Sequence, residues 1–335
     1  MNNIIDINYD KNDNKKINNN TNIIKISGSI GMKKLIKNNK NIFMFYDDHS
    51  NISYCKNEGS VFLHDVFDKI INNTSDYIIL LEEPFVGNYS NIKFLWNETP
   101  HVIKFRNFYK KIIKKCSDSK KCNVFPIDIR LILCDVSIDE LVSNINSETY
   151  FDNYKISVLE YFKHMLYLFD YISWKEELFK DSDPNIKFIK KVFNEFKQDK
   201  YYLKLLNQFE KIFFTFIEPN KNIEIKLFIK KYKDNLYDFF TGYPFENNNE
   251  YIFLDQYDKL INGIMEFYTY ILLSCMNYKN IIIYSGYYHS NNLSYILNKY
   301  YDFSIIYEIG NTEDIEKKDD ANINNCIYVN KKIFQ

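Results

Sequence analysis

The chain of 335 residues has little of several features, and each scarcity excludes a class of protein. Six cysteines without a C-x-x-C pair are too few for a disulfide scaffold, so we expect reduced thiols in a cytoplasmic protein. No apolar run approaches the roughly 18 residues of a membrane span. The net charge of -1 gives no general attraction to phosphate backbones. We therefore expect neither a membrane span nor a nucleic-acid partner.

The scarce residue types also show where to look for chemistry. The sequence contains one alanine and two arginines, against 44 asparagines, 29 tyrosines and 28 phenylalanines. This bias is typical of an AT-rich genome, because the codons for Asn, Ile and Lys are poor in G and C. An arginine, glycine or histidine is then more informative about a physical requirement than it would be in an ordinary chain.

Short apolar runs alternate with segments of helical spacing in the first and last parts of the chain. The spacing predicts strands at 23–27, 42–46, 77–81, 123–129, 280–284 and 303–309, and helices at 61–71, 101–116 and 292–299. Several of the strands are apolar throughout, which is typical of strands buried on both faces. The alternation predicts an α/β fold with a mostly parallel β-sheet flanked by helices.

The pattern changes twice along the chain and so suggests a domain organisation. Residues 1–22 form a polar, disordered tail by composition, and residues 23–146 and 278–312 together form one α/β domain. Residues 147–277 have long helical periods and few strand signals, which predicts an all-helical insertion or lid. The remaining residues, 313–335, are a C-terminal extension.

Polar and charged residues follow the predicted strands directly. Parallel sheets bind ligands beyond the carboxyl ends of their strands, so these residues are the candidates for a site. They are Asp47, Asp48 and His49 after the second strand, Glu82 and Glu83 after the third, Asp128 and Arg130 after the fourth, and Gly286 and His289 after the fifth. The alternative is structural, because Asp, Ser and Gly are also ordinary turn and helix-capping residues. Imidazoles with carboxylates suit a divalent metal, or a water that a histidine activates.

Two of these turns resemble the paired G-x-x-H motifs of the superfamily of Tiki and TraB proteins, erythromycin esterases and ChaN haem-binding proteins. Gly286-Tyr287-Tyr288-His289 matches the second motif, and Tyr46-Asp47-Asp48-His49 matches the first except that tyrosine replaces glycine. Glu82 stands where the family has a glutamate after an intervening strand. The resemblance covers roughly residues 23–130 and 280–309. The biased composition is also similar to that of uncharacterised members in large DNA viruses.

The resemblance implies a site that in some members is hydrolytic and metal-dependent and in others only binds a ligand. We expect a hydrolase whose small-molecule or peptide substrate is unknown. His49, Glu82 and His289 would be the catalytic residues or the ligands of a divalent metal of unknown identity. Arg130 would hold a carboxylate through its bidentate fork. The alternative is a catalytically inactive viral or host-interaction protein that keeps the fold and binds a partner through its helical region. Tyr46 in place of glycine supports this alternative, because a side chain restricts the backbone where glycine does not.

Overall fold

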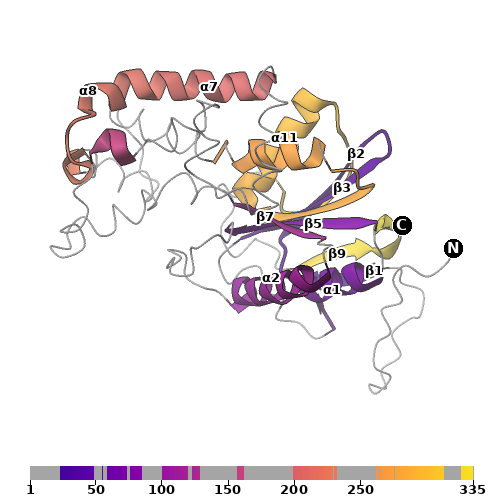
Figure 1. Cartoon of the computed structure of the whole chain (residues 1–335). Helices are drawn as coiled ribbons and strands as arrows, with labels where there is room; N and C mark the ends of the chain where they lie inside the picture. Colours follow the sequence, from indigo (N-terminus) through magenta and orange to yellow (C-terminus); the bar gives the residue numbers. More distant parts are fainter. Residues whose placement is uncertain are drawn as a thin grey trace. The chain divides into compact units, whose positions relative to one another are not determined.

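The structure is a computed structural model of an α/β protein, and only part of the chain is described. The described residues are 23–48, 55, 59–73, 76–84, 100–119, 123–128, 157–161, 199–228, 230–231, 262–263, 265–274, 276–312 and 326–334. They contain two β-sheets and the helices that cover them (Figure 1). The α/β class expected from the alternating pattern is therefore what the described residues form.

The larger sheet has six strands and is mixed. Its order is β6 (Val124–Asp128), β5 (Tyr77–Pro84), β7 (Asn280–Gly286), β3 (Lys40–Asp47), β2 (Gly31–Lys37) and β8 (Ser304–Gly310). The central strand β7 pairs in parallel with β5 on one side and with β3 on the other. Strand β2 pairs antiparallel with both β3 and β8. The parallel part predicted from the continuous apolar runs thus forms the middle of the sheet.

Strand β2 is absent from the predicted strands, because lysines interrupt its apolar residues. It forms because a tight turn at Asn38, which has a φ of 51°, folds the chain back so that β2 pairs with β3 along its whole length. Asparagine tolerates this left-handed conformation better than most residues. Lys33 in the middle of β2 is 2% exposed. A strand containing a buried lysine does not show the apolar signature that sequence reasoning uses.

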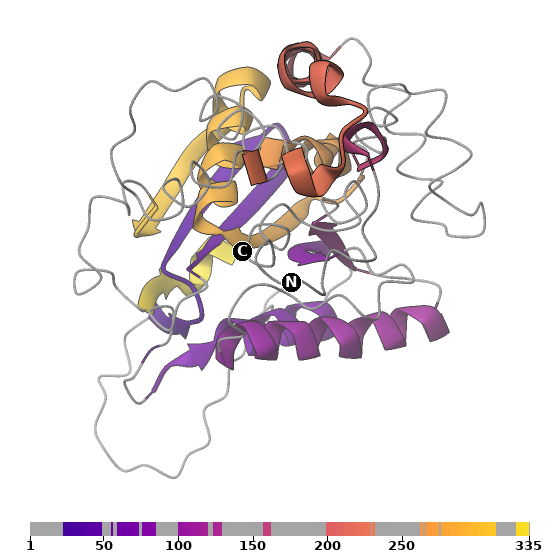
Figure 2. The same ribbon diagram turned by 90° about the vertical axis from the view of Figure 1, so that its left-hand side faces the viewer.

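Helices cover both faces of the six-stranded sheet, as the alternating pattern predicts. Helix α11 (Tyr287–Tyr301) follows β7 and packs on β3 and β7, whereas α1 (Leu63–Asn73) and α2 (Pro100–Ser119) cover the opposite face. Figure 1 shows α11 above the sheet with α1 and α2 below it, and Figure 2 shows the long helix α2 running along the lower side. Phe67 of α1 and Phe105 of α2 pack on Tyr284 of β7 in the main hydrophobic core.

A second, three-stranded sheet of order β4-β1-β9 corrects two expectations and contains one strand that was not predicted. Strand β1 (Ile23–Ser27) belongs to this sheet and not to the larger one. Val61 and Phe62 form the short parallel strand β4 rather than the start of a helix. The predicted C-terminal extension contains β9 (Cys326–Asn330), which pairs antiparallel with β1, and a 3-10 helix, η6 (Lys331–Phe334). These corrections share one cause, since strand pairing between distant segments leaves no local signal.

The cysteines also depart from expectation. Cys55 and Cys326, 271 positions apart in the chain, form a disulfide. The prediction of reduced thiols is therefore wrong for this pair. Cys55 is consequently not available as a thiolate ligand or nucleophile while the disulfide is formed. The other four cysteines carry no described side chain.

The chain divides into two compact units. One consists of residues 1–83, 96–127 and 276–335, and the other of residues 84–95 and 128–275. Described elements of the second unit are α7 (Lys200–Ile212), the π-helix η3 (Phe213–Ile217), α8 (Glu218–Asn220) and helical residues 262–263 and 265–274. Most of the segment predicted as a helical insertion lies outside the described residues. None of the helices that the structure describes is long and apolar enough to cross a membrane.

Candidate functional site

The candidate site is built at the carboxyl ends of the three central parallel strands. Tyr284 of β7 lies between Leu81 of β5 and Phe45 of β3 in the strand register, and Gly286 lies opposite Asp47. Parallel strands in register end at the same edge, so the residues that follow them in the chain meet in space. The described polar residues that end or follow β3, β5 and β7 are therefore gathered at one end of these strands.

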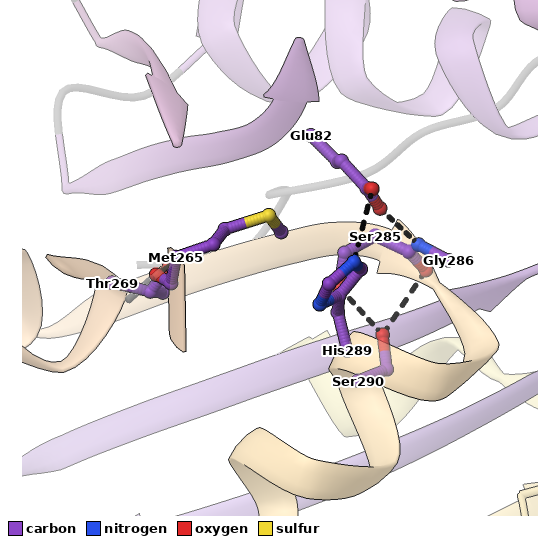
Figure 3. Close-up of polar contacts among 7 residues, drawn as sticks. All are labelled: Glu82, Met265, Thr269, Ser285, Gly286, His289 and Ser290. Atoms are coloured by element: carbon purple, nitrogen blue, oxygen red, sulfur yellow. Dashed lines mark hydrogen bonds and ion pairs between the residues drawn. The ribbon is translucent and has the colours of Figure 1, made fainter. Parts of the chain in front are cut away.

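Glu82 joins two residues of the intact G-x-x-H motif (Figure 3). One carboxylate oxygen, Oε2, accepts the backbone N–H of Gly286 at 2.5 Å, and the other, Oε1, lies 3.5 Å from Nε2 of His289. The side chains of Glu82 and His289 are each only 9% exposed. The hydrogen bond from the main chain restricts rotation of the Glu82 carboxylate. The other oxygen is therefore held in a fixed orientation toward the imidazole. Glu82 and His289 thus form a buried acid–imidazole pair.

The first turn of helix α11 is held in place from both sides. Gly286 caps the helix without a side-chain hydrogen bond of its own, and the Glu82 carboxylate receives its N–H instead. A negative charge is favourable at a helix N-terminus, where the backbone N–H groups point outward. Ser290 lies within the helix, and its hydroxyl is 2.7 Å from that of Ser285 and 3.3 Å from the carbonyl oxygen of Phe45. These contacts anchor the turn that carries His289 to strands β3 and β7.

Tyr46, the residue that departs from the G-x-x-H pattern, is an ordinary strand residue. It pairs with Gly31 of β2 and Ser285 of β7, and its φ is not positive. Its ring is fully buried, with its centroid 6.0 Å from that of Tyr287 and 5.8 Å from Nζ of Lys33. The backbone at this position therefore imposes no requirement for glycine. What tyrosine changes is the space on the α11 face, which its ring fills.

Glu83 and Asp47 lie on the opposite face of the sheet from His289. Successive residues of a strand point to opposite faces, so Glu83 faces α2 while Glu82 faces α11. Glu83 makes an ion pair with Arg106 of α2, with Oε2 3.6 Å from Nε, and both side chains are almost buried. The phenol of Tyr284 is on this face too. Burial raises the pKa of Tyr284 well above its usual value, and the carboxylate of Asp47 raises it further.

Several predicted site residues are not part of this arrangement. His49 and Arg130 lie outside the described residues. Asp48 follows β3 and is half-buried, and Asp128 is the buried last residue of β6, the strand next to β5. Of the nine candidates, the structure brings together Glu82, Gly286 and His289 on one face and places Asp47 and Glu83 on the other.

Two cations near the site have no role in the sequence predictions, namely Arg106 and Lys33. Arg106 is one of only two arginines in the chain, so its rarity was the signal that could have drawn attention to it. Lys33 lies 3.4 Å from Oε1 of Glu308, its neighbour across the strand pair, and sits over the ring of Tyr46. One lysine among 41 offers no comparable signal, because only its burial is unusual.

Glu82 and His289 place two donor atoms of the kind that bind divalent metals close together. Oε1 of Glu82 and Nε2 of His289 are 3.5 Å apart, close to the separation of about 3.3 Å expected for two ligands of a tetrahedral ion with bonds of about 2.0 to 2.1 Å. Within the described part of the chain, no group of three or more His, Cys, Asp or Glu residues is arranged to hold a metal ion. The described residues therefore offer only this pair of donor atoms, which by itself does not make a metal site.

Comparison of the chain with known protein families, curated proteins and solved structures finds no match.

Proposed function

We propose that the protein is a hydrolase of the G-x-x-H type in which His289 activates a water and Glu82 orients the imidazole. The observation that supports this proposal is the bridging position of Glu82, which contacts the main chain of Gly286 and the imidazole of His289 with its two oxygens. A carboxylate oriented against a histidine is a recurrent arrangement for general-base catalysis. The placement beyond the ends of parallel strands is where such sheets bind ligands.

The chemistry of the pair follows from its charges. A neutral imidazole takes the proton from a water as that water attacks a carbonyl or related electrophile of a small-molecule or peptide substrate. The imidazolium that forms lies 3.5 Å from the Glu82 carboxylate, which stabilises its positive charge in a buried environment. His289 then donates the proton that it took from the water to the leaving group. His49, the histidine of the other motif, is proposed as a second catalytic group or ligand.

A divalent metal is the second form of the same proposal. When bound, such an ion lowers the pKa of a coordinated water and supplies a hydroxide near neutral pH. Glu82 and His289 would be two of its ligands, and the proposal requires His49 as the third. The Gly286 N–H would still hold one oxygen of the Glu82 carboxylate, and the other oxygen would be available as a ligand.

The alternative is a protein that binds without catalysis, and the buried ring of Tyr46 favours it. This ring and that of Tyr287 occupy the α11 face beside the motif, next to the buried ammonium of Lys33. The ring of Tyr46 fills space that a glycine at this position would leave open to a substrate. In this reading the protein keeps the fold and uses its helical region as an interaction surface.

The proposals are tested by a hydrolase screen on ester, amide and phosphoester substrates, with metal analysis of the same purified samples. The variants are His49→Ala, His289→Ala and Glu82→Gln, and His64→Gln is the matched control, because His64 lies on α1 and contacts Asp65 instead. For a general base we expect His289→Ala to lower the rate by roughly 10²- to 10⁴-fold. His64→Gln should leave the rate unchanged.

Two results would contradict the catalytic proposal. One is full activity in both the His289→Ala and the Glu82→Gln variants. The other is the absence of turnover by the wild-type protein across the screen, which would support the binding alternative. Metal that copurifies with the wild type and with His64→Gln but not with His49→Ala would support the metal-dependent form.

A further inference from the structure

Two distant cysteines meet at the end of the smaller sheet. Cys55 and Cys326 are 271 positions apart, yet their Cα atoms are 5.4 Å apart and the side chains form a disulfide. This separation lies within the range usual for disulfides. Both residues are buried. The disulfide therefore attaches the start of β9 to the segment that contains Cys55.

Ser27 is the point at which the disulfide meets the sheet. Cys326 is the first residue of β9 and lies opposite Ser27, the last residue of β1. The backbone N–H of Cys55 donates to the hydroxyl of Ser27 at 2.8 Å. The disulfide thus closes the β1–β9 ladder at one end. Strand β9 is an edge strand of a three-stranded sheet, which is the kind of element that opens by local unfolding.

The residues after β9 complete the main core. We call residues 326–334 the C-terminal segment. The ring of Phe334 packs on those of Phe43 and Phe45, with centroids 5.4 Å and 6.4 Å apart. Its carbonyl oxygen accepts the hydroxyl of Tyr77 at 2.6 Å, and the carbonyl oxygen of Ile333 accepts Nζ of Lys34 at 2.8 Å. The segment is therefore held by non-covalent docking at its end and by a covalent bond at its start.

We propose that the Cys55–Cys326 disulfide is a redox latch that controls the docking of the C-terminal segment. Docking holds the two sulfurs together, and the bond in turn holds the segment on the core. The two equilibria are linked, so the factor by which docking favours the disulfide equals the factor by which the disulfide favours docking. The proposal is independent of the hydrolytic site.

Opening of the latch is a thiol–disulfide exchange with a small-molecule thiol such as glutathione. A glutathione thiolate attacks one sulfur, the S–S bond breaks, and its electron pair leaves on the other cysteine, which takes up a proton. A second glutathione thiolate attacks the mixed disulfide, releasing the second protein thiolate, which is also protonated, and oxidised glutathione. Two glutathione thiols are oxidised and one protein disulfide is reduced. Closing is the reverse and uses oxidised glutathione.

The test measures both sides of the linkage on the full-length protein. The protein is equilibrated with mixtures of reduced and oxidised glutathione, the thiols are trapped by alkylation, and the Cys55–Cys326 pair is quantified by mass spectrometry. Hydrogen exchange of the β9 amides is measured in the oxidised and reduced forms. We expect reduction to lower the protection of these amides by at least about tenfold.

The second arm weakens docking without touching the cysteines. Phe334→Leu should lower the equilibrium constant for disulfide formation by the same factor by which it weakens docking in the reduced protein. Should this variant fail to fold, Tyr77→Phe, which loses one hydrogen bond to the segment, replaces it. A Cys55→Ser/Cys326→Ser variant should exchange like the reduced protein in every buffer, while Cys275→Ser should keep the redox response.

Two outcomes would overturn the latch. The first is a non-reducing peptide map of the protein in oxidised glutathione that lacks the bond between Cys55 and Cys326. The second is equal protection of the β9 amides in the oxidised and reduced forms, which would make the disulfide a static crosslink without control over docking.

Discussion

The rings of Tyr46 and Tyr287 pack against each other with centroids 6.0 Å apart, which joins the end of β3 to the start of α11. Tyr46 is fully buried and holds a regular place in the register of β3. Its ring therefore contributes to packing between the sheet and α11. Tyr46 therefore has a structural role in this chain.

Replacing Tyr46 by glycine should destabilise the protein. The change removes a fully buried ring, and losses of this kind cost about 3 to 5 kcal/mol of unfolding free energy because a cavity remains. The regular strand conformation offers no backbone strain for glycine to relieve. Urea unfolding followed by circular dichroism measures the effect. Tyr46→Phe, which keeps the ring, should lose much less, and equal losses in the two variants would contradict the packing role.

Gly31→Ala should be strongly destabilising because another backbone occupies the space beside this residue. A Cβ at Gly31 would overlap the carbonyl oxygen of Asn311 and lie 2.8 Å from its carbonyl carbon. Backbone cannot move aside as a flexible side chain does, so we expect a loss of about 3 kcal/mol or more. Gly59→Ala is the matched control, with a φ of 83° and no atom within 4 Å of the added Cβ. It should lose only about 1 kcal/mol, from the backbone conformation alone.

The ion pair between Arg106 and Glu83 should show strong coupling in a double-mutant cycle. Removing the cation by Arg106→Met leaves a nearly buried carboxylate without this partner, which typically costs about 3 to 5 kcal/mol. Glu83→Gln in the same background removes the buried charge itself, so the double variant should recover part of the loss. The unfolding free energies of the four proteins give the coupling. Additive losses would mean that the two charges do not interact in the folded protein.

Protonation of His64 should make the protein less stable below neutral pH. Burial lowers the pKa of His64 in the folded protein from its usual 6.5, and Lys104 lowers it as well, against the opposing effect of Asp65. Below pH 6.5 the unfolded chain therefore binds this proton before the folded protein does, so the unfolding free energy falls as the pH decreases. His64→Phe should show a smaller fall over this range in urea unfolding. The same fall in both proteins would show that other groups cause it.

Much of the central sheet was predictable because its signals are local. Ile281, Ile282 and Ile283 make β7 apolar on both faces, and the structure places it in the middle of the sheet. The positions of Glu82, Gly286 and His289 at one edge followed from the rule for parallel strands. Strands β2 and β9 were not predictable in the same way. The first contains a buried lysine, and the second depends on pairing with a strand some 300 residues earlier in the chain.

The sequence by itself determined the apolar strands, the motif residues that follow them and the opposite directions of Glu82 and Glu83, because a strand alternates its side chains with a period of two residues. Tertiary structure alone decided which face each glutamate meets. The crossover of the chain puts α11 and His289 beside Glu82, and α2 with Arg106 beside Glu83. It also brought Cys55 to Cys326. Alternation is fixed by local backbone geometry, whereas partners across a core depend on how segments distant in the chain pack together.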